Sequence, residues 1–364
     1  MDLSVGIVGF PNVGKSTLFN AITASEIEAQ NYPFCTIEPN VGIVSIPDSR
    51  LNKLQTITNS QKIIPAAIKF VDIAGLVPGA SKGEGLGNKF LSHIRETSVI
   101  AHVVRCFEDD NIVHVHGKVD PIDDVEIINL ELILADLEMA TKMRDGQLKK
   151  SKTGDKEEKS RLAVLEKIVA QLEASKPVRQ LEFTEGERLI IKGYHFLSSK
   201  RIVYVANIKE SEIGQENEWV AKMKAYAEKD GDECIVVCAR IEEEIAGLDE
   251  SEKKEFLEAL DLTESGLDNL SRACFSLLGL QTFLTSGEKE TRAWTISVDA
   301  TAPEAAGVIH TDFEKGFIRA NIISFDEFVA CDGLKIAKEK GLVRQEGKEY
   351  KMQDGDIVEF LFNV

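Results

Sequence analysis

Eight consecutive residues near the start of the sequence have the pattern of a phosphate-binding loop (P-loop). Gly9–Ser16 reads Gly-Phe-Pro-Asn-Val-Gly-Lys-Ser and matches GxxxxGK followed by Ser or Thr. Glycines allow the backbone to wrap around phosphate oxygens, and the N–H groups at the start of the following helix attract negative charge. We therefore expect this loop to bind the phosphates of a nucleotide. The expected contacts come from Gly9, Asn12, Val13, Gly14, Lys15, Ser16 and Thr17.

Two side chains of the P-loop have definite expected roles. Lys15 should bridge the β- and γ-phosphates and is the expected catalytic lysine, and the Ser16 hydroxyl should coordinate Mg²⁺. The alternative is a chance glycine turn. An apolar strand precedes the loop and a helical pattern follows it, which is the context that a P-loop requires.

Two further segments can complete a magnesium site. Asp72 follows the apolar run Ile68–Val71 and begins an Asp-x-x-Gly pattern that ends at Gly75. Asp72 can hold Mg²⁺ through water, and the Gly75 N–H can meet the γ-phosphate. Thr36 lies between the P-loop helix and that strand, and can supply a second hydroxyl ligand when a γ-phosphate is present. Taken alone, Thr36 would be an ordinary loop residue.

The nucleotide base should be contacted where two later apolar runs end, because such folds place base-reading residues there. A backbone N–H after the last run can also serve the base. The expected residues are Asn207, Ile208, Glu210, Cys238 and Ala239.

The elements that must position these residues are short apolar runs separated by helical stretches. Continuous apolar strands that alternate with helices indicate a parallel sheet covered on both faces, hence an α/β fold. The runs are Leu3–Val8, Ala67–Val71, Ile100–Cys106, Ile202–Ala206 and Cys234–Ala239.

One long helical segment, residues 126–200, interrupts this alternation. Two apolar stripes flank the polar stretch Lys149–Lys156, which predicts an antiparallel helical hairpin. Thr184 and Glu187 then have the spacing of a capping box that opens another helix. The stripes are Ile127, Leu130, Leu134 and Leu137, and Leu162, Leu165, Val169 and Leu172.

A third unit is predicted to begin near Gln281. It is richer in short strands, at Trp294–Ile296, Gly316–Ala320 and Ile357–Phe362, and Asp354-Gly355-Asp356 marks a turn before the last of them. We therefore expect a small mixed α+β domain.

Several motifs together resemble the YchF family of ribosome-binding ATPases, within the Obg-related GTPases. The P-loop reads GxPNVGKST, the Asp72 motif reads DIAG, and Asn-x-x-Glu follows the next-to-last strand. The runs Val71–Val77 with Gly79–Gly87 and His310–Ala320 narrow the resemblance to this family. It extends over essentially the whole chain.

The resemblance implies a three-part organisation and a function. It implies a P-loop NTPase G domain formed by residues 1–125 and 201–280, an inserted α-helical domain of residues 126–200, and a C-terminal TGS domain with a β-grasp fold, residues 281–364. It further implies Mg²⁺-dependent ATP hydrolysis coupled to a change in the switch loops on the ribosome, with the large subunit and the 70S particle as partners.

The choice between ATP and GTP depends on Glu210. The wider class carries NKxD, whose Asp accepts hydrogen bonds from the ring N–H and amine of guanine, and this chain has Ile208 and Glu210 at the Lys and Asp positions. Adenine has no amine at that edge that could donate a hydrogen bond to a carboxylate. Chemistry alone leaves guanine open, because Glu210 is also an acceptor; the resemblance implies ATP. The alternatives are a GTPase of the same class, a small-molecule P-loop kinase, or an interaction module in which hydrolysis is incidental.

Two details of the hydrolysis site depart from Ras-like switches. Leu76 occupies the position at which those switches have a water-orienting Gln. His114, in a polar loop after a strand, is the candidate catalytic substitute that could reach the γ-phosphate, and an ordinary solvated histidine is the alternative. Asn12 resembles the P-loop Asn of potassium-activated members of the class, so K⁺ is a second expected cofactor unless Asn12 only shapes the loop.

The net charge of −18 argues against a protein that coats nucleic acid with its whole surface. The acidity is concentrated in residues 201–280, which sum to −10, whereas residues 126–200 sum to +1. The segment from Lys142 to Arg161 contains eight basic and four acidic residues. We therefore expect this tip of the hairpin to contact rRNA; the alternative is a charged face that is only solvated.

No apolar run is as long as the roughly 18 residues that a helix needs to cross a bilayer, and the N-terminal residues lack the pattern of a signal peptide. The six scattered cysteines include no CxxC pair. We therefore expect a cytoplasmic protein with reduced thiols and no membrane partner.

Overall fold

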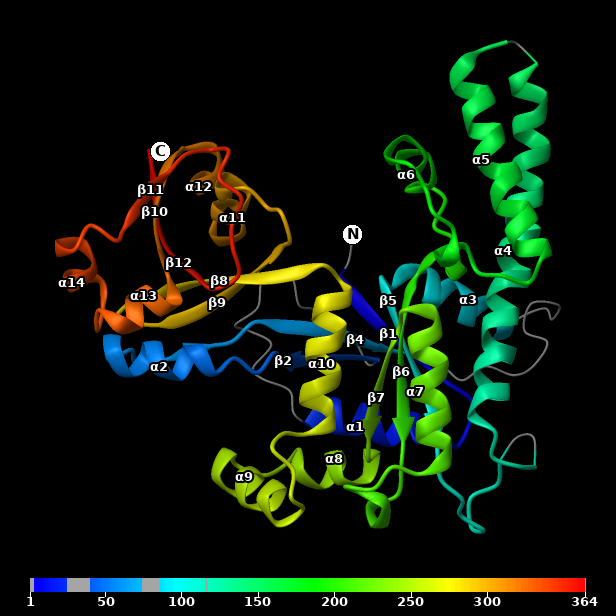
Figure 1. The fold of residues 1–364 in the computed structure, drawn as a ribbon, viewed down its shortest axis with the longest axis horizontal. Helices are drawn as coiled ribbons and strands as arrows, with labels where there is room; N and C mark the ends of the chain where they lie inside the picture. Colours follow the sequence, from blue (N-terminus) through cyan, green and yellow to red (C-terminus); the bar gives the residue numbers. More distant parts are fainter. Residues whose placement is uncertain (1–2, 25–39, 74–85, 115–116, 153, 364) are drawn as a thin grey trace. The chain divides into compact units, whose positions relative to one another are not determined.

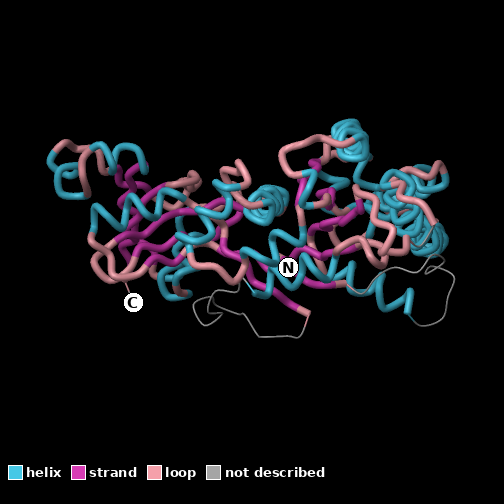
Figure 2. The backbone as a smooth tube through the Cα atoms, turned by 90° about the horizontal axis from the view of Figure 1, so that it is seen from below, coloured by secondary structure: helices cyan, strands magenta, loops and turns pink. Residues whose placement is uncertain are grey.

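The structure is a computed structural model. It describes residues 3–24, 40–73, 86–114, 117–152 and 154–363. The chain forms two compact units. The first contains the described residues of Met1–Ser25, Glu38–Gly42 and Lys69–Leu270, and the second contains those of Ile43–Ile68 and Ser271–Val364. Both units combine strands with helices (Figure 2).

One sheet has the strand order β2-β4-β1-β5-β6-β7, and its strands β1, β5, β6 and β7 lie wholly in the first unit. The neighbours from β4 to β7 all pair in parallel, and every residue of β1 and β5 is buried. The predicted α/β sheet is therefore confirmed. The strands are β1 (Ser4–Val8), β2 (Val41–Ser45), β4 (Ala67–Asp72), β5 (Val99–Arg105), β6 (Arg201–Asn207) and β7 (Glu233–Val237).

Helices follow these strands along the chain (Figure 1). Their ends are marked by the expected signals: at α7, the Asn217 side chain accepts from the Val220 N–H, and Gly231 ends the helix with a φ of 73°. Parallel strands bring their carboxyl ends to one edge of the sheet, where the predicted site residues follow them. The helices are α1 (Lys15–Ala24), α3 (Leu86–Glu96), α7 (Glu218–Asp230), α8 (Ala239–Ile245), α9 (Glu250–Ala259) and α10 (Gly266–Leu277).

The segment between β5 and β6 contains the predicted helical hairpin. The helices α4 (Pro121–Ser151) and α5 (Lys156–Glu173) lie side by side (Figure 1). Asp120 and Asp155 cap them, because each carboxylate accepts a hydrogen bond from a backbone N–H of the first turn. The short helices η2 (Val178–Gln180), α6 (Glu185–Ile191) and η3 (Leu197–Ser199) follow, and the capping box predicted at Thr184 and Glu187 is present at α6.

The predicted apolar stripe is confirmed in α5 at three of its four residues, with Leu162 half-buried, and is partly wrong in α4. Leu165, Val169 and Leu172 are buried in the hairpin. In α4, however, Leu130 and Leu134 are 44% and 36% exposed. One apolar stripe does not describe α4, because this helix packs against β5 and α7 as well as against α5. Each of these neighbours buries a different face of the helix. The buried residues of α4 include Val125, Ile128, Leu132, Ile133, Asp136 and Ala140.

A buried carboxylate holds the segment that returns from the hairpin to the sheet. Asp136 is fully buried and accepts hydrogen bonds from Leu197 N at 2.9 Å, Ser198 N at 2.7 Å and Ser198 Oγ at 2.6 Å. Burial raises the pKa of the Asp136 carboxyl above its ordinary value, and these hydrogen bonds oppose the rise. The middle of α4 is thereby tied to the turn that precedes β6.

The second unit contains a mixed sheet with the order β11-β10-β12-β8-β9-β3. β12 pairs with β8 in parallel, whereas β8–β9, β10–β11 and β10–β12 are antiparallel. The predicted start at Gln281 adjoins the first residue of β8, and the three predicted strands coincide with parts of β9, β10 and β12. The strands are β3 (Ile63–Ile64), β8 (Leu280–Ser286), β9 (Thr291–Ser297), β10 (Phe317–Ser324), β11 (Arg344–Glu346) and β12 (Asp356–Phe362).

Residues 43–68 belong to this second unit, although the sequence pattern places them within the segment 1–125. Ile63 of β3 pairs in parallel with Thr291 of β9, and Arg50 Nη1 lies 2.8 Å from Asp354 Oδ2. These contacts join residues more than 200 positions apart, which periodicity cannot reveal. The helices of the unit are α2 (Ser49–Thr58), α11 (Ala302–Ile309), α12 (Thr311–Lys315), α13 (Phe325–Ala330) and α14 (Leu334–Glu339).

Among the residues that the structure describes, no helix combines the length and the apolar content needed to cross a membrane.

Candidate nucleotide-binding site

The P-loop leaves the buried strand β1 and ends where α1 begins. Gly14 has a φ of 96°, which side chains rarely tolerate. A Cβ at Gly14 would lie 2.1 Å from Asn207 Nδ2, and one at Gly9 would lie 2.6 Å from Val103 O. Both motif glycines are therefore required by close packing, and Gly14 also by its backbone angle.

The side chain of Asn207, at the end of β6, holds the P-loop from behind. Its Nδ2 donates to Val13 O at 2.8 Å, and its Oδ1 accepts from Ala239 N at 3.0 Å. Asn207 is 5% exposed, so both bonds are sheltered from water. The residue predicted to read the base therefore also positions the phosphate loop. The Ala239 N–H, predicted to serve the base, is engaged with Asn207.

The predicted catalytic lysine and magnesium residue lie together. Lys15 Nζ donates to Asp72 Oδ1 at 2.9 Å, and Lys15 is 9% exposed. Asp72 ends β4 in register with Ile7 of β1, the strand that leads into the P-loop. Ser16 is exposed in the first turn of α1.

These donors fit a magnesium ion that is shared with a nucleotide. Mg²⁺ prefers oxygen ligands and is usually held by one or two protein groups together with phosphates and water, which the Ser16 hydroxyl and the Asp72 carboxylate can satisfy. Within the described ranges, no group of three or more His, Cys, Asp or Glu side chains could hold a metal by itself. The predicted ligand Thr36 and the predicted γ-phosphate contact Gly75 lie outside the described residues.

A cavity of about 900 Å³ extends from the P-loop to the ends of β6 and β7. It collects most of the predicted nucleotide residues, which indicates that the strand ends meet as expected. From the predicted set, the lining includes Asn12, Gly14, Thr17, Asn207, Ile208, Glu210, Cys238 and Ala239. Burial raises the pKa of the Cys238 thiol, so this group is neutral in the lining.

The cavity also has residues that the sequence analysis missed. Phe107 and Ile112, from the loop after β5, line it together with Lys209 and Arg240. Phe107 is only 9% exposed, and Lys209 Nζ lies 6.0 Å from the centre of its ring. Phe107 immediately follows the apolar run Ile100–Cys106, so its place at the carboxyl end of a strand was the available signal.

Glu210 lies at the open side of this cavity. It is exposed at the start of η4 (Glu210–Glu212), whereas Ile208 is 6% exposed. An apolar wall of Ile208 and Phe107 suits the flat face of a purine. Recognition of a particular purine edge then falls to Glu210 and to the backbone.

His114 is not the solvated loop side chain that the sequence suggests. It is 7% exposed, and its Nε2 lies 3.0 Å from Asp124 Oδ2 in the first turn of α4. The hydrogen bond to Asp124 holds the imidazole, so a role at the γ-phosphate would require His114 to leave that bond. Val113, the residue before His114, contacts the P-loop, because its carbonyl oxygen accepts a hydrogen bond from Asn12 Nδ2 at 3.2 Å.

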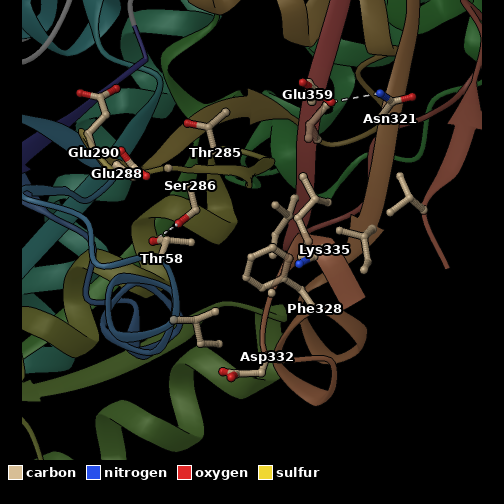
Figure 3. Close-up of a pocket in the computed structure, with 18 of the residues that line it drawn as sticks. Thr58, Thr285, Ser286, Glu288, Glu290, Asn321, Phe328, Asp332, Lys335 and Glu359 are labelled. Atoms are coloured by element: carbon tan, nitrogen blue, oxygen red, sulfur yellow. Dashed lines mark hydrogen bonds between the residues drawn. The ribbon is translucent and has the colours of Figure 1, made fainter. Parts of the chain in front are cut away.

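A second cavity, of about 770 Å³, lies wholly within the second unit (Figure 3). Hydrogen bonds join side chains on its walls: Thr58 and Ser286 hydroxyls at 3.0 Å, and Asn321 Nδ2 to Glu359 Oε2 at 3.1 Å. Its described lining does not include the P-loop residues Gly9–Ser16. The nucleotide chemistry is therefore assigned to the first unit.

Two family models match parts of the chain. The model described as a 50S ribosome-binding GTPase matches residues 4–139. The C-terminal model of YchF GTPases, described as a protein of unknown function, matches residues 280–363. The first match contains the P-loop, and the second begins with β8.

Relatives match over the full length. The chain is 56% identical over 366 residues to the ribosome-binding ATPase YchF of Bacillus subtilis and 54% identical over 364 residues to that of Escherichia coli O157:H7, with 100% of each chain covered. The solved structure of a Schizosaccharomyces pombe YchF GTPase is similar with a TM-score of 0.88 and 36% identity, covering 99% of this chain and 98% of that one.

Gly14→Ala is expected to abolish nucleotide binding, because the new methyl group would displace Asn207 Nδ2 and the φ of 96° would be strained. Gly146→Ala is the matched control, since a Cβ there meets nothing within 4 Å, and alanine should strengthen α4 by about 1 kcal/mol. Titration with a fluorescent ATP analogue checks both. Binding by the Gly14 variant within threefold of wild type would contradict this geometry.

Proposed function

The chain belongs to the YchF family, and we propose that it is a Mg²⁺-dependent, ribosome-binding ATPase, as its bacterial relatives are named. One observation of the structure carries the enzymatic part. A P-loop whose lysine meets Asp72 opens into a cavity that ends at Ile208 and Glu210 instead of the Lys and Asp of NKxD.

The base end of the cavity supports ATP over GTP. Guanine binding in the wider class rests on an Asp that accepts two hydrogen bonds, and the longer Glu210 stands exposed at the start of a short helix. Two other residues of the lining, Phe107 and Ile208, are apolar and can pack against the face of either purine. The site therefore lacks the Lys and the Asp with which the wider class binds guanine, and this supports ATP together with the names of the relatives.

The phosphate end supports a switch. Ser16 and Asp72 would hold Mg²⁺, which would stabilise the charge of the phosphates during transfer. Lys15 lies 2.9 Å from Asp72 and can move the short distance to a phosphate oxygen. Thr36 would add a ligand and Gly75 an N–H when the γ-phosphate is present, so that hydrolysis releases both loops. The amide of Asn12 would help to hold K⁺ beside the phosphates.

Hydrolysis of ATP and GTP, each with and without ribosomes, tests this function. We expect turnover with ATP to exceed that with GTP at equal concentration, and to change when ribosomes are added. K⁺ and Na⁺ buffers form a further pair of conditions, with faster turnover in K⁺ expected. Equal or faster GTP turnover would instead identify a GTPase of the same class, and transfer that requires an acceptor would identify a kinase.

We also propose that His114 acts in hydrolysis after leaving Asp124. His114→Ala should then lower kcat by about 10²-fold with little change in nucleotide affinity. Asp124→Ala removes the same hydrogen bond but keeps the imidazole, so it should retain much more turnover. Equal losses in the two variants, measured as steady-state ATPase rates, would show that only the bond between them matters.

The tip of the α4–α5 hairpin is the proposed contact with rRNA. Among the described residues, no partner within 4 Å neutralises Lys149, Lys152, Lys156 or Lys159, and all four are exposed. Nearby basic residues differ, because Lys142 pairs with Glu138 and Arg161 with Glu157. Unpaired lysines can replace the counterions of rRNA phosphates, on the large subunit and on the 70S particle.

Changing these four lysines to Glu should weaken ribosome association by roughly tenfold or more and reduce its dependence on salt. The control changes Lys222, Lys224, Lys229 and Lys254 to Glu, which alters the net charge equally but within the acidic residues 201–280. Co-sedimentation at several salt concentrations measures both variants. Equal losses in both would contradict a specific role for the tip.

A further inference from the structure

Arg105 is a buried charge whose hydrogen bonds all go to one loop. It is the last residue of β5 and is 1% exposed. Its Nε donates to Phe107 O at 3.0 Å, Nη1 to Ile112 O at 2.9 Å and Nη2 to Asp109 O at 3.2 Å. The guanidinium also lies 4.8 Å from the centre of the Phe107 ring. Burial lowers the pKa of Arg105, and the carboxylates of Asp109 and Glu108 oppose this.

The loop that Arg105 holds, residues 107–114, contacts three functional parts of the first unit. Phe107, Asp109 and Ile112 line the nucleotide cavity. Val113 O accepts a hydrogen bond from Asn12 of the P-loop. His114 is bonded to Asp124 at the beginning of α4. The same eight residues therefore touch the base end of the cavity, the phosphate loop and the hairpin helix.

We infer that Arg105 is a positioning residue that shapes the wall of the nucleotide cavity and, through this loop, couples the cavity to α4. The inference rests on the proposed function. Three carbonyls arranged around one planar guanidinium match its fork of five N–H donors, which an ammonium group cannot reproduce. A change in the loop at Ile112 or Val113 would be passed to His114, and from there to the first turn of α4.

Arg105→Lys tests the positioning role, because it keeps the charge but cannot bind all three carbonyls. We expect the KM for ATP to rise about tenfold, the preference for ATP over GTP to fall, and kcat to change less than threefold. Arg161→Lys, at an exposed pair on α5, is the control and should change none of these values. A variant with unchanged KM and base preference, including one in which only the apparent kcat falls in proportion to lost folded protein, would overturn the inference.

Hydrogen exchange of the wild-type chain and of Arg105→Lys tests the coupling. Addition of ATP should increase protection both in residues 107–114 and in the first turns of α4, and Arg105→Lys should uncouple the two. Increased protection of the P-loop with no change in α4 would overturn the coupling. If the wild type hydrolyses no ATP, the proposed function fails, whereas exchange of the nucleotide-free loop in wild type and Arg105→Lys still decides whether Arg105 holds it.

Discussion

The two hydrogen bonds of the Asn207 amide join the strand ends on which the nucleotide site depends. One fixes Val13 in the loop after β1, and the other fixes Ala239, which follows β7. Asn207 is almost completely buried, so the loss of either partner would leave a buried polar group unpaired, at a cost of about 1–3 kcal/mol. The phosphate end and the base end of the cavity are thereby held at a fixed separation by one side chain.

Two buried carboxylates of α4 anchor the inserted hairpin. Asp124, at the beginning of α4, is hydrogen-bonded to His114. Asp136, further along the helix, accepts hydrogen bonds from the backbone N–H groups of Leu197 and Ser198 before β6. Both carboxylates are buried, so α4 is held at its beginning and at its middle by polar contacts that are costly to break. The hairpin tip carries the exposed lysines Lys149, Lys152, Lys156 and Lys159, which suit a surface that binds an anionic partner.

Much of the fold followed from local patterns. Apolar runs predicted the parallel strands, and the capping signals of α6 and the turn before β12 lie where the sequence indicates them. The stripe on α4 was partly wrong because a helix with several partners has no single apolar face. The membership of α2 in the second unit was missed because it depends on contacts such as Arg50 with Asp354, which no local pattern contains.

The sequence by itself determined the phosphate-binding chemistry, because the P-loop depends on neighbouring residues: Gly14 for its backbone angle and Lys15 for its charge. It also indicated Asp72 and Asn207, since residues after parallel strands must meet at one edge. Only the tertiary structure decided that His114 is hydrogen-bonded to Asp124 and that Arg105 binds three carbonyls of the loop after β5. A side chain's role in these cases is set by carbonyls and carboxylates that reach it through folding, and local spacing carries no information about them.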